Sequence, residues 1–396
     1  MKILLIPPND LLRNPIPNRM YHIAKRLSGK HTIYLLSYTK HPLAGEIRRQ
    51  LDAIEIPIRN ALATKNLGLY YLVNIPQIYA AIKQVISNED IDIVVHANIL
   101  PSLIASKIAR KFKIPCIYDY LDHYPESAAV YYIRGKNVVE QGVRLLVSQA
   151  LKNSDAVITP SYGLKKVLED INHNKPIYVV PNGVDADLFK PIDQTLARKT
   201  IGLDTDYKLA LLHGSLDVWI DVASVIKAVS KLRQTIDIRL LIVGFSHIKS
   251  YYRLLLEYAK YYRIDKYIYT YPIQQYEKMP FFINASDLVF SPVKKMIMNL
   301  ATPLKIAEAL SCAVPVVTTN IVEYKIWYKY GVFTYNTYAD LEKILKKLLN
   351  ELYEIKKFLA KYSIEFRNKF SWEKIAGEYE DILYSISLKK MNINGN

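Results

Sequence analysis

The sequence predicts an α/β fold built from two doubly wound, Rossmann-like domains. Short apolar runs with high β propensity alternate with segments of helical periodicity, which favours parallel sheets joined by crossover helices. The pattern is completed before residue 182 and begins again after it. A chain of 396 residues is long for one hydrophobic core and suits two. Because doubly wound sheets bind ligands at the carboxyl ends of their strands, we expect the two domains to face each other across a ligand cleft.

The two halves follow the same order of strands and helices. In the first half, the expected strands cover residues 3–6, 32–37, 93–96, 116–118, 156–159 and 178–180. A helix is expected at residues 18–27, after the first strand and its loop. In the second half, the expected strands cover residues 209–213, 240–243, 267–270, 288–291, 314–318 and 331–334.

The charge of the chain limits the kinds of partner. A formal net charge of +16 predicts attraction to an anion, such as a sugar nucleotide, a lipid pyrophosphate, an acidic membrane surface or nucleic acid. The 32 tyrosines are interleaved with Lys and Arg, but no RNA-binding or DNA-binding motif accompanies them. We therefore expect no nucleic-acid partner.

The sequence predicts a cytoplasmic protein without a membrane span. The long uncharged run at residues 66–82 falls short of the roughly 20 apolar residues that a spanning helix needs. Pro7 and Pro8 interrupt the apolar start too early for a signal peptide. Cys116 and Cys312 lie in apolar runs in opposite halves, so we expect two buried thiols rather than a disulfide or a metal site.

Three segments resemble one enzyme family. Residues 181–191 read Pro-Asn-Gly-Val-Asp-Ala-Asp-Leu-Phe-Lys-Pro, residues 285–292 read Ala-Ser-Asp-Leu-Val-Phe-Ser-Pro, and residues 303–308 read Pro-Leu-Lys-Ile-Ala-Glu. They are similar to segments of the retaining sugar-nucleotide glycosyltransferases of the family 4 type, which have the GT-B fold. The resemblance covers most of the chain and is most specific in its second half.

The resemblance implies an activity and a division of the chain. The implied reaction transfers a hexose-like sugar from a nucleoside-diphosphate donor to a glycan or lipid-linked acceptor, with retention at the anomeric carbon. Residues 1–182 would form the acceptor domain and residues 183–370 the donor domain. A helix at residues 371–388 would cross back to the first domain, and residues 389–396 would form a tail. Such enzymes work without a bound metal, so we expect no metal and no cofactor, with the nucleotide sugar as substrate.

The helix that begins near Thr302 is the centre of the implied donor site. Thr302 and Pro303 are predicted as its N-cap and first residue, so that the backbone N–H groups of Leu304 and Lys305 can bind a diphosphate. The resemblance assigns Glu308 to the ribose hydroxyls, which an ionised carboxylate binds through two hydrogen bonds. A solvated Lys305–Glu308 pair on an ordinary helix is the alternative. The resemblance also implies donor contacts from Gly214, Ser215, Phe245 and Ile273.

Two positions depart from the family pattern. Leu300 replaces the first glutamate of the E-x7-E motif and cannot form a hydrogen bond with a sugar hydroxyl. The loop that follows Gly214 contains two aspartates and no cation, where the family has basic residues. We therefore expect Lys305, the helix dipole and Lys294 or Lys295 to neutralise the diphosphate.

In the first half, the polar run at residues 118–127 supplies the expected catalytic side chains. Asp122 aligns with the acid of a similar Asp-x-x-Pro-Glu-Ser stretch in the family, and His123 is its neighbour. Either group, at the end of a strand, can orient an acceptor hydroxyl. The alternative is a turn with an Asp cap and a partly buried His. Arg19 is a candidate phosphate contact, although a lone arginine is more often part of a salt bridge.

Two other functions stay open. One keeps the fold and replaces transfer by epimerisation of a sugar nucleotide. The other is a catalytically degenerate partner subunit, which Leu300 and the cation-free loop after Gly214 would suit. The segments at residues 67–86 and 134–152 are expected either to contact the inner membrane face peripherally or to be core helices with a solvated face.

Overall fold

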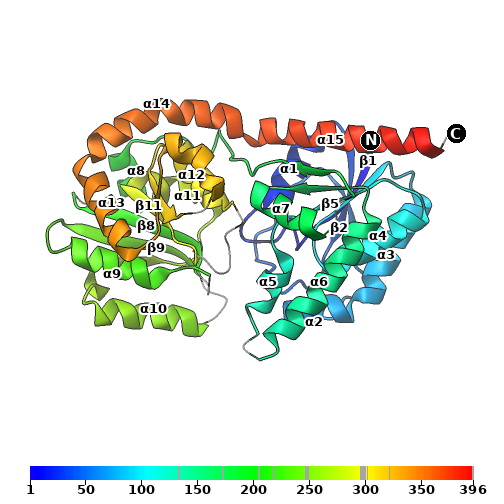
Figure 1. Ribbon diagram of the computed structural model, residues 1–396, viewed down its shortest axis with the longest axis horizontal. Helices are drawn as coiled ribbons and strands as arrows, with labels where there is room; N and C mark the ends of the chain where they lie inside the picture. Colours follow the sequence, from blue (N-terminus) through cyan, green and yellow to red (C-terminus); the bar gives the residue numbers. More distant parts are fainter. Residues whose placement is uncertain are drawn as a thin grey trace. The chain divides into compact units, whose positions relative to one another are not determined.

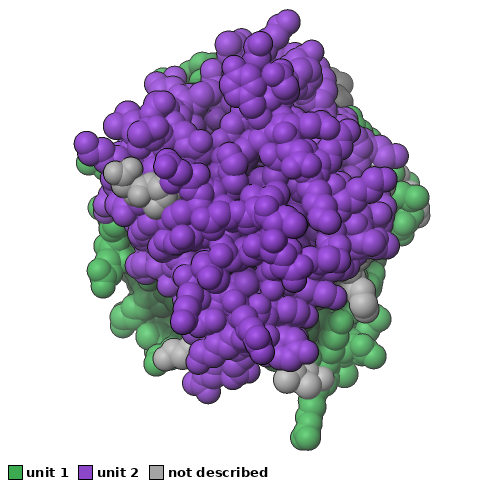
Figure 2. Space-filling model, turned by 90° about the vertical axis from the view of Figure 1, so that its left-hand side faces the viewer, with its two compact units in different colours: residues 1–181, 372–396 green, residues 182–371 purple. Residues whose placement is uncertain are grey.

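The chain folds into two compact units. The computed structural model describes residues 1–132, 134–171, 174–203, 206–216, 219–245, 249–294, 300, 302–320 and 322–394. Unit 1 contains Met1–Pro181 and Trp372–Asn396, and unit 2 contains Asn182–Ser371 (Figure 2). Each unit has its own parallel sheet with helices, which confirms the predicted α/β fold class.

In the described residues of unit 1, seven parallel strands form a sheet in the order β3-β2-β1-β4-β5-β6-β7 (Figure 1). The strands are β1 (Lys2–Ile6), β2 (Thr32–Ser37), β3 (Ile54–Pro57), β4 (Ile93–His96), β5 (Cys116–Asp119), β6 (Ala156–Thr159) and β7 (Ile177–Val179). The helices are α1 (Arg19–Leu27), α2 (Leu67–Val73), α3 (Ile75–Asn88), α4 (Leu100–Lys111), α5 (Tyr124–Ala129), α6 (Lys136–Asn153), α7 (Tyr162–Ile171) and α15 (Trp372–Asn394). The strands expected from the sequence do not include β3, although Ile54, Ile56 and Ile58 alternate with Glu55, Pro57 and Arg59, which is the pattern of a half-buried strand.

In the described residues of unit 2, six parallel strands form a sheet in the order β10-β9-β8-β11-β12-β13. The strands are β8 (Lys208–Ser215), β9 (Ile238–Phe245), β10 (Ile268–Tyr271), β11 (Leu288–Ser291), β12 (Val316–Thr319) and β13 (Val332–Tyr335). The α-helices are α8 (Gln194–Thr200), α9 (Val222–Leu232), α10 (Lys249–Tyr261), α11 (Met279–Ala285), α12 (Leu304–Ser311), α13 (Tyr338–Asn350) and α14 (Leu352–Phe370). Short 3-10 helices are η1 (Asp265–Tyr267), η2 (Tyr276–Lys278) and η3 (Val322–Tyr330).

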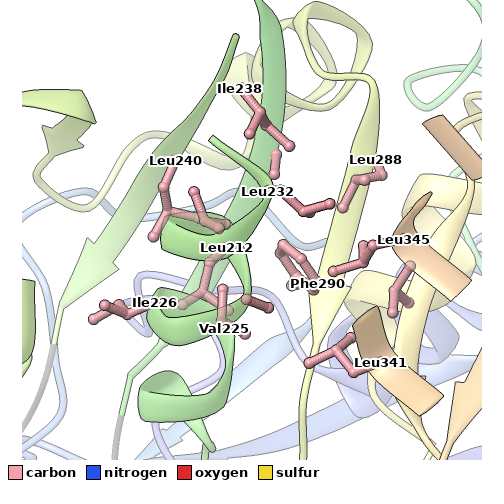
Figure 3. Packing of buried hydrophobic residues seen from close by; sticks show 14 of the residues in the cluster. Leu212, Val225, Ile226, Leu232, Ile238, Leu240, Leu288, Phe290, Leu341 and Leu345 are labelled. Carbon is pink, nitrogen blue, oxygen red and sulfur yellow. The ribbon is translucent and has the colours of Figure 1, made fainter. Parts of the chain in front are cut away.

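The strands of unit 2 alternate their side chains between two apolar layers. In β8, Leu209 and Leu211 pack into the layer that contains Ile306 of α12. Leu212 packs into the opposite layer, next to Val225 and Ile226 of α9, and the same layer contains Leu341 and Leu345 of α13 (Figure 3). Because side chains along a strand alternate with a period of two, His213 belongs to the α12 face, at the carboxyl end of β8.

Helix α15 belongs to unit 1 and packs on α1. Trp372 is fully buried, and its ring stacks on the His22 ring with 4.8 Å between centroids. Two turns further on, His31 donates a 2.9 Å hydrogen bond to Glu380. The helix continues to Asn394, past its expected end at residue 388.

Both cysteines are buried free thiols, Cys116 in β5 and Cys312 directly after α12. In the part of the chain that the structure describes, no helix has both the length and the apolar content of a membrane span.

Candidate functional site

Two glycines bring the ends of β8 and β9 close together in unit 2. Gly214 and Gly244 are opposite each other in the parallel register, with positive φ values of 100° and 146°. A β-carbon at Gly244 would lie 2.1 Å from the carbonyl oxygen of Gly214, which no other residue type can accommodate. The end of β8 is therefore a stretch of backbone that no side chain at these two positions covers.

Lys305 supplies a cation at this backbone. Its Nζ donates a 2.9 Å hydrogen bond to the carbonyl oxygen of His213. A β-carbon at Gly214 would lie 3.4 Å from the same Nζ. Burial lowers the pKa of the half-buried ammonium to about 8, although the nearby Glu308 carboxylate favours its charged form. The Lys305 ammonium thus supplies a positive charge beside the Gly214 turn, although the loop that follows this turn contributes no cation.

The first turn of α12 differs by one residue from the prediction. The structure places Pro303 at the N-cap and Leu304 at the first helical position, so Thr302 lies before the helix. No side chain caps this terminus. Asn182 holds the preceding loop instead, because its Nδ2 donates a 2.8 Å hydrogen bond to the Thr302 carbonyl oxygen. The start of a helix with no side-chain cap is a place where backbone N–H groups and the helix dipole favour an anion.

Glu308 lies one turn further along α12. It is 6 % exposed, and burial raises the pKa of its carboxyl to about 7. The Tyr276 hydroxyl, through a hydrogen bond, and the Lys305 charge oppose this rise. The carboxyl therefore ionises near neutral pH, where it can accept hydrogen bonds from ligand hydroxyls.

Two buried polar atoms near this helix escaped the sequence prediction. His213 Nε2 and Ser291 Oγ have no hydrogen-bond partner among the described residues. Leu212 pairs with Phe290 across β8 and β11, so His213 and Ser291 are the next opposite pair. Burial lowers the pKa of His213 to about 3, so its imidazole stays neutral. The alternation of side chains along β8 could have placed His213 on this face. Ser291 could have been found as the last residue of the strand predicted at residues 288–291.

The remaining predicted donor residues follow neighbouring strands. Ser215 ends β8 opposite Phe245, which ends β9. Ile273 lies after β10 and is 39 % exposed. Leu300 is half-buried, and Lys294, three residues after β11, is exposed. Asp217, Lys295 and residue 301 lie outside the described residues.

One acid of the loop after Gly214 has a structural role. Asp221 caps α9, because its carboxylate accepts hydrogen bonds from the backbone N–H and the hydroxyl of Ser224, at 3.2 Å and 2.6 Å. This cap is the ordinary use of an aspartate at a helix start.

In unit 1, Asp122 and His123 follow β5 and lead into α5. Asp122 accepts a 2.8 Å bond from the backbone N–H of His123 and a 2.5 Å bond from the Ser127 hydroxyl. The His123 imidazole is 7 % exposed and lies 3.4 Å from the Tyr120 hydroxyl. Burial lowers the pKa of His123, so the ring is neutral at physiological pH. The Asp122 carboxylate thus holds the loop at the start of α5 through His123 and Ser127.

Arg19 lies inside unit 1 and is paired with protein groups. Its side chain is 3 % exposed, and its Nε lies 3.4 Å from Oδ2 of Asp119, which is fully buried. Its Nη1 donates a 2.8 Å hydrogen bond to the Pro181 carbonyl oxygen. The Tyr379 hydroxyl donates to the same Asp119 oxygen at 3.2 Å. The guanidinium therefore links α1 to Asp119 in β5 and to Pro181, the last residue of the first segment of unit 1.

No group of three His, Cys, Asp or Glu side chains suited to a metal ion is found among the described residues.

Two family models match adjacent parts of the chain. The model of Glycosyltransferase Family 4 matches residues 16–188. The model of Glycosyl transferases group 1 matches residues 193–363. A search of curated protein sequences gives no match. Together the two family matches span most of the chain, one in each half.

Several solved structures share the fold over nearly the whole chain. Sucrose-phosphate synthase from Thermosynechococcus elongatus aligns with a TM-score of 0.81 and 16% identity, over 98% of this chain and 99% of its own. HepE from Anabaena in complex with UDP aligns with a TM-score of 0.70 and 14% identity, over 97% and 100%. A glycosyltransferase from Rickettsia africae aligns with a TM-score of 0.69 and 18% identity, over 97% and 98%. These likenesses show the fold, and with the two family models they establish that the chain belongs to the GT-B glycosyltransferases of the family 4 type.

Proposed function

We propose that the protein transfers a hexose-like sugar from a nucleoside-diphosphate sugar to a glycan or lipid-linked acceptor, with retention at the anomeric carbon. The observation that carries this proposal is the position of Lys305, hydrogen-bonded to the His213 carbonyl oxygen at 2.9 Å and adjacent to Gly214. A cation, an uncovered glycine backbone and a helix N-terminus in one place suit a diphosphate.

The donor would lie along the first turns of α12. Its diphosphate would accept hydrogen bonds from backbone N–H groups of Leu304 and Lys305 and from the Lys305 ammonium. Glu308, one turn on, would bind the ribose hydroxyls through its carboxylate. The neutral imidazole of His213 and the Ser291 hydroxyl, both buried, would offer further hydrogen bonds to the same ligand.

The implied reaction requires no enzymic nucleophile. The acceptor oxygen bonds to the anomeric carbon on the face from which the diphosphate leaves, and the bond from that carbon to the diphosphate oxygen breaks. The proton of the acceptor hydroxyl passes to an oxygen of the leaving diphosphate. Lys305 and the backbone N–H groups stabilise the negative charge that develops on the leaving group. No metal and no cofactor take part in this scheme.

Asp122 and His123 would orient the acceptor in unit 1. The neutral His123 ring can accept a hydrogen bond from an acceptor hydroxyl and so orient its oxygen. Asp122 holds the backbone N–H of His123, so it would fix the position of the loop in addition to any direct contact.

One observation favours a second candidate function, that of an inactive partner subunit. Leu300 replaces a hydrogen-bonding glutamate, and the described residues of the loop directly after Gly214 include no Lys or Arg. In that case the fold would persist without turnover.

Release of nucleoside diphosphate from UDP-, GDP- and ADP-sugars, with and without candidate acceptors, tests the proposal. UDP-glucose is a reasonable first donor, since HepE has been solved with it. The proposal expects release with one base, and a product whose anomeric configuration, read by NMR, matches the donor. Inversion at the anomeric carbon would contradict the retaining mechanism, and binding without release would favour the inactive subunit.

A further inference from the structure

One surface of unit 1 exposes large apolar side chains in two segments that are distant in the sequence. We call this surface the apolar-basic face. Its apolar side chains come from α2 with the loop before it, and from the turn between α5 and α6 with the start of α6. Each of these side chains is between 39 % and 77 % exposed; they are Leu62, Leu67, Leu69, Leu72, Tyr132 and Val138. Exposed apolar residues are normal when scattered singly, but here they recur within short stretches.

The two segments lie against each other. A β-carbon at Gly68, in the first turn of α2, would lie 3.6 Å from the Tyr132 hydroxyl oxygen. Figure 1 shows α2 and the start of α6 at the same end of unit 1. The exposed leucines of α2 and the exposed tyrosine before α6 thus belong to one continuous surface.

The exposed charged side chains beside these apolar residues are basic. Residues 56–88 contain three basic residues and no Asp or Glu, and residues 127–139 contain two basic residues and no Asp or Glu. The basic side chains nearest the apolar positions are all exposed; they are Arg59, Lys65, Arg134 and Lys136. The acids that flank the second segment, Glu126 and Glu140, are half-buried, and Glu140 pairs with Arg144 at 3.1 Å. An apolar surface with exposed cations beside it matches a partner that offers both an apolar layer and negative charge.

We propose that the apolar-basic face binds the surface of a bilayer that contains anionic phospholipids. Leucines would enter the boundary between headgroups and acyl chains, Tyr132 would lie at the headgroup level, and the four cations would contact lipid phosphates. A second copy of the chain fits less well, because a symmetric contact would bring the same cations face to face.

The apolar-basic face lies near the candidate acceptor residues, so membrane binding would bring a lipid-linked acceptor to them. This role of the face rests on the proposed function. Helix α5, six residues or about 9 Å long, connects His123 to the turn that contains Tyr132. A protein held at a bilayer by this face would therefore have its candidate acceptor residues a short distance from the lipid headgroups. A lipid-linked acceptor would reach them without leaving the membrane.

Co-sedimentation with lipid vesicles tests the proposal. The intact protein should sediment with vesicles of phosphatidylcholine and phosphatidylglycerol, less with phosphatidylcholine alone, and less as salt concentration rises. Replacing three cations, Lys65→Gln, Arg134→Gln and Lys136→Gln, should weaken binding on the order of 100-fold, because each Lys or Arg near an anionic surface contributes about fivefold. The pair Leu69→Ser and Leu72→Ser should weaken it while leaving the unfolding temperature unchanged.

A matched control uses exposed tyrosines of unit 2. Tyr261 and Tyr353 are 77 % and 75 % exposed, and their replacement by Ser should leave vesicle binding unchanged. Equal binding by the Leu69→Ser, Leu72→Ser variant and the wild type would overturn the proposal. So would self-association that this variant abolishes, since the face would then bind a second copy. Release of nucleoside diphosphate without vesicles should be the same in all variants, so a failure of lipid binding is distinguishable from a failure of the proposed reaction.

Discussion

The ammonium of Lys305 lies 2.9 Å from the carbonyl oxygen of His213, so α12 and the end of β8 are joined by a charged hydrogen bond. The two residues are far apart in the sequence, and no motif links them. Because Gly214 follows His213 and has no side chain, the ammonium lies beside bare backbone. This arrangement is the basis of the predictions for unit 2.

Gly214→Ala should weaken nucleotide binding and also reduce the stability of the fold. The new β-carbon would lie 3.4 Å from Lys305 Nζ, on a backbone with a φ of 100° that alanine tolerates poorly. We expect a loss of about 1–3 kcal/mol in the free energy of unfolding and at least tenfold weaker binding of the nucleotide, measured by urea unfolding and calorimetry. Gly142→Ala is the control, because Gly142 lies in α6 with open space around it, and should stabilise by up to about 1 kcal/mol. Wild-type affinity in Gly214→Ala would refute this role of the glycine.

Glu308→Gln should stabilise the free protein at pH 8 and weaken nucleotide binding. Burial raises the pKa of the Glu308 carboxyl from 4.5 to about 7 on folding, so the folded state binds its proton more tightly than the unfolded state. Stability is therefore lost as pH rises from 4.5 through 7, and the full cost is present above that range. Glu308→Gln removes this charge and should therefore increase the free energy of unfolding by about 1–3 kcal/mol at pH 8 and by almost nothing at pH 4, measured by urea unfolding. A variant less stable than wild type at pH 8 would contradict this account of the carboxylate.

Nucleotide affinity should fall as pH rises above about 8. The Lys305 ammonium, with its pKa lowered to about 8 by burial, loses its charge in the free protein in this range. Each further pH unit should then cost up to about tenfold in the affinity for a diphosphate. In Lys305→Gln, binding should be weaker and independent of pH over the same range. Constant wild-type affinity from about pH 7 to pH 10, measured by calorimetry, would exclude Lys305 as the cation that binds the diphosphate.

In unit 1, Asp119→Ala should destabilise the protein by about 3–5 kcal/mol, because it leaves the buried Arg19 guanidinium without its carboxylate. Tyr379→Phe, which removes one hydrogen bond to the same carboxylate, should cost only about 1 kcal/mol. The exposed pair Lys165–Glu169 provides a comparison, since Lys165→Gln should change stability by less than about 0.5 kcal/mol. Urea unfolding distinguishes these values. A loss below about 1 kcal/mol in Asp119→Ala would show that the pair contributes little.

The fold class could be predicted because strands buried in a parallel sheet have a local pattern. The run around Leu209 and Leu211 in β8 is apolar along its length, and the sequence marks it as a strand without any tertiary information. The edge strand β3 could not be predicted in this way, since Ile54 and Ile56 alternate with Glu55 and Pro57 and form no continuous apolar run. The sequence thus predicts the other three edge strands, β7, β10 and β13, and misses β3.

The candidate site could be predicted only in part, for the same reason. Lys305 and Glu308 are one turn apart on a single helix, so their proximity follows from helix geometry. The contacts of Lys305 with His213 and of Asn182 with Thr302 join residues more than 90 positions apart, and no local rule predicts them. Arg19 was considered as a phosphate contact because it begins the predicted helix, and no local rule predicts its pairing with Asp119, 100 positions away.

The most direct test of the central claim is thermal unfolding of the wild type and of Glu308→Ala in the presence of UDP, GDP, ADP and their sugar conjugates. If unit 2 binds the donor at the start of α12, one base should stabilise the wild type by about 2.7 kcal/mol at 100 times its dissociation constant, and the same concentration should stabilise Glu308→Ala much less. No stabilisation by any nucleotide, or equal stabilisation of both proteins, would contradict the assignment of this site.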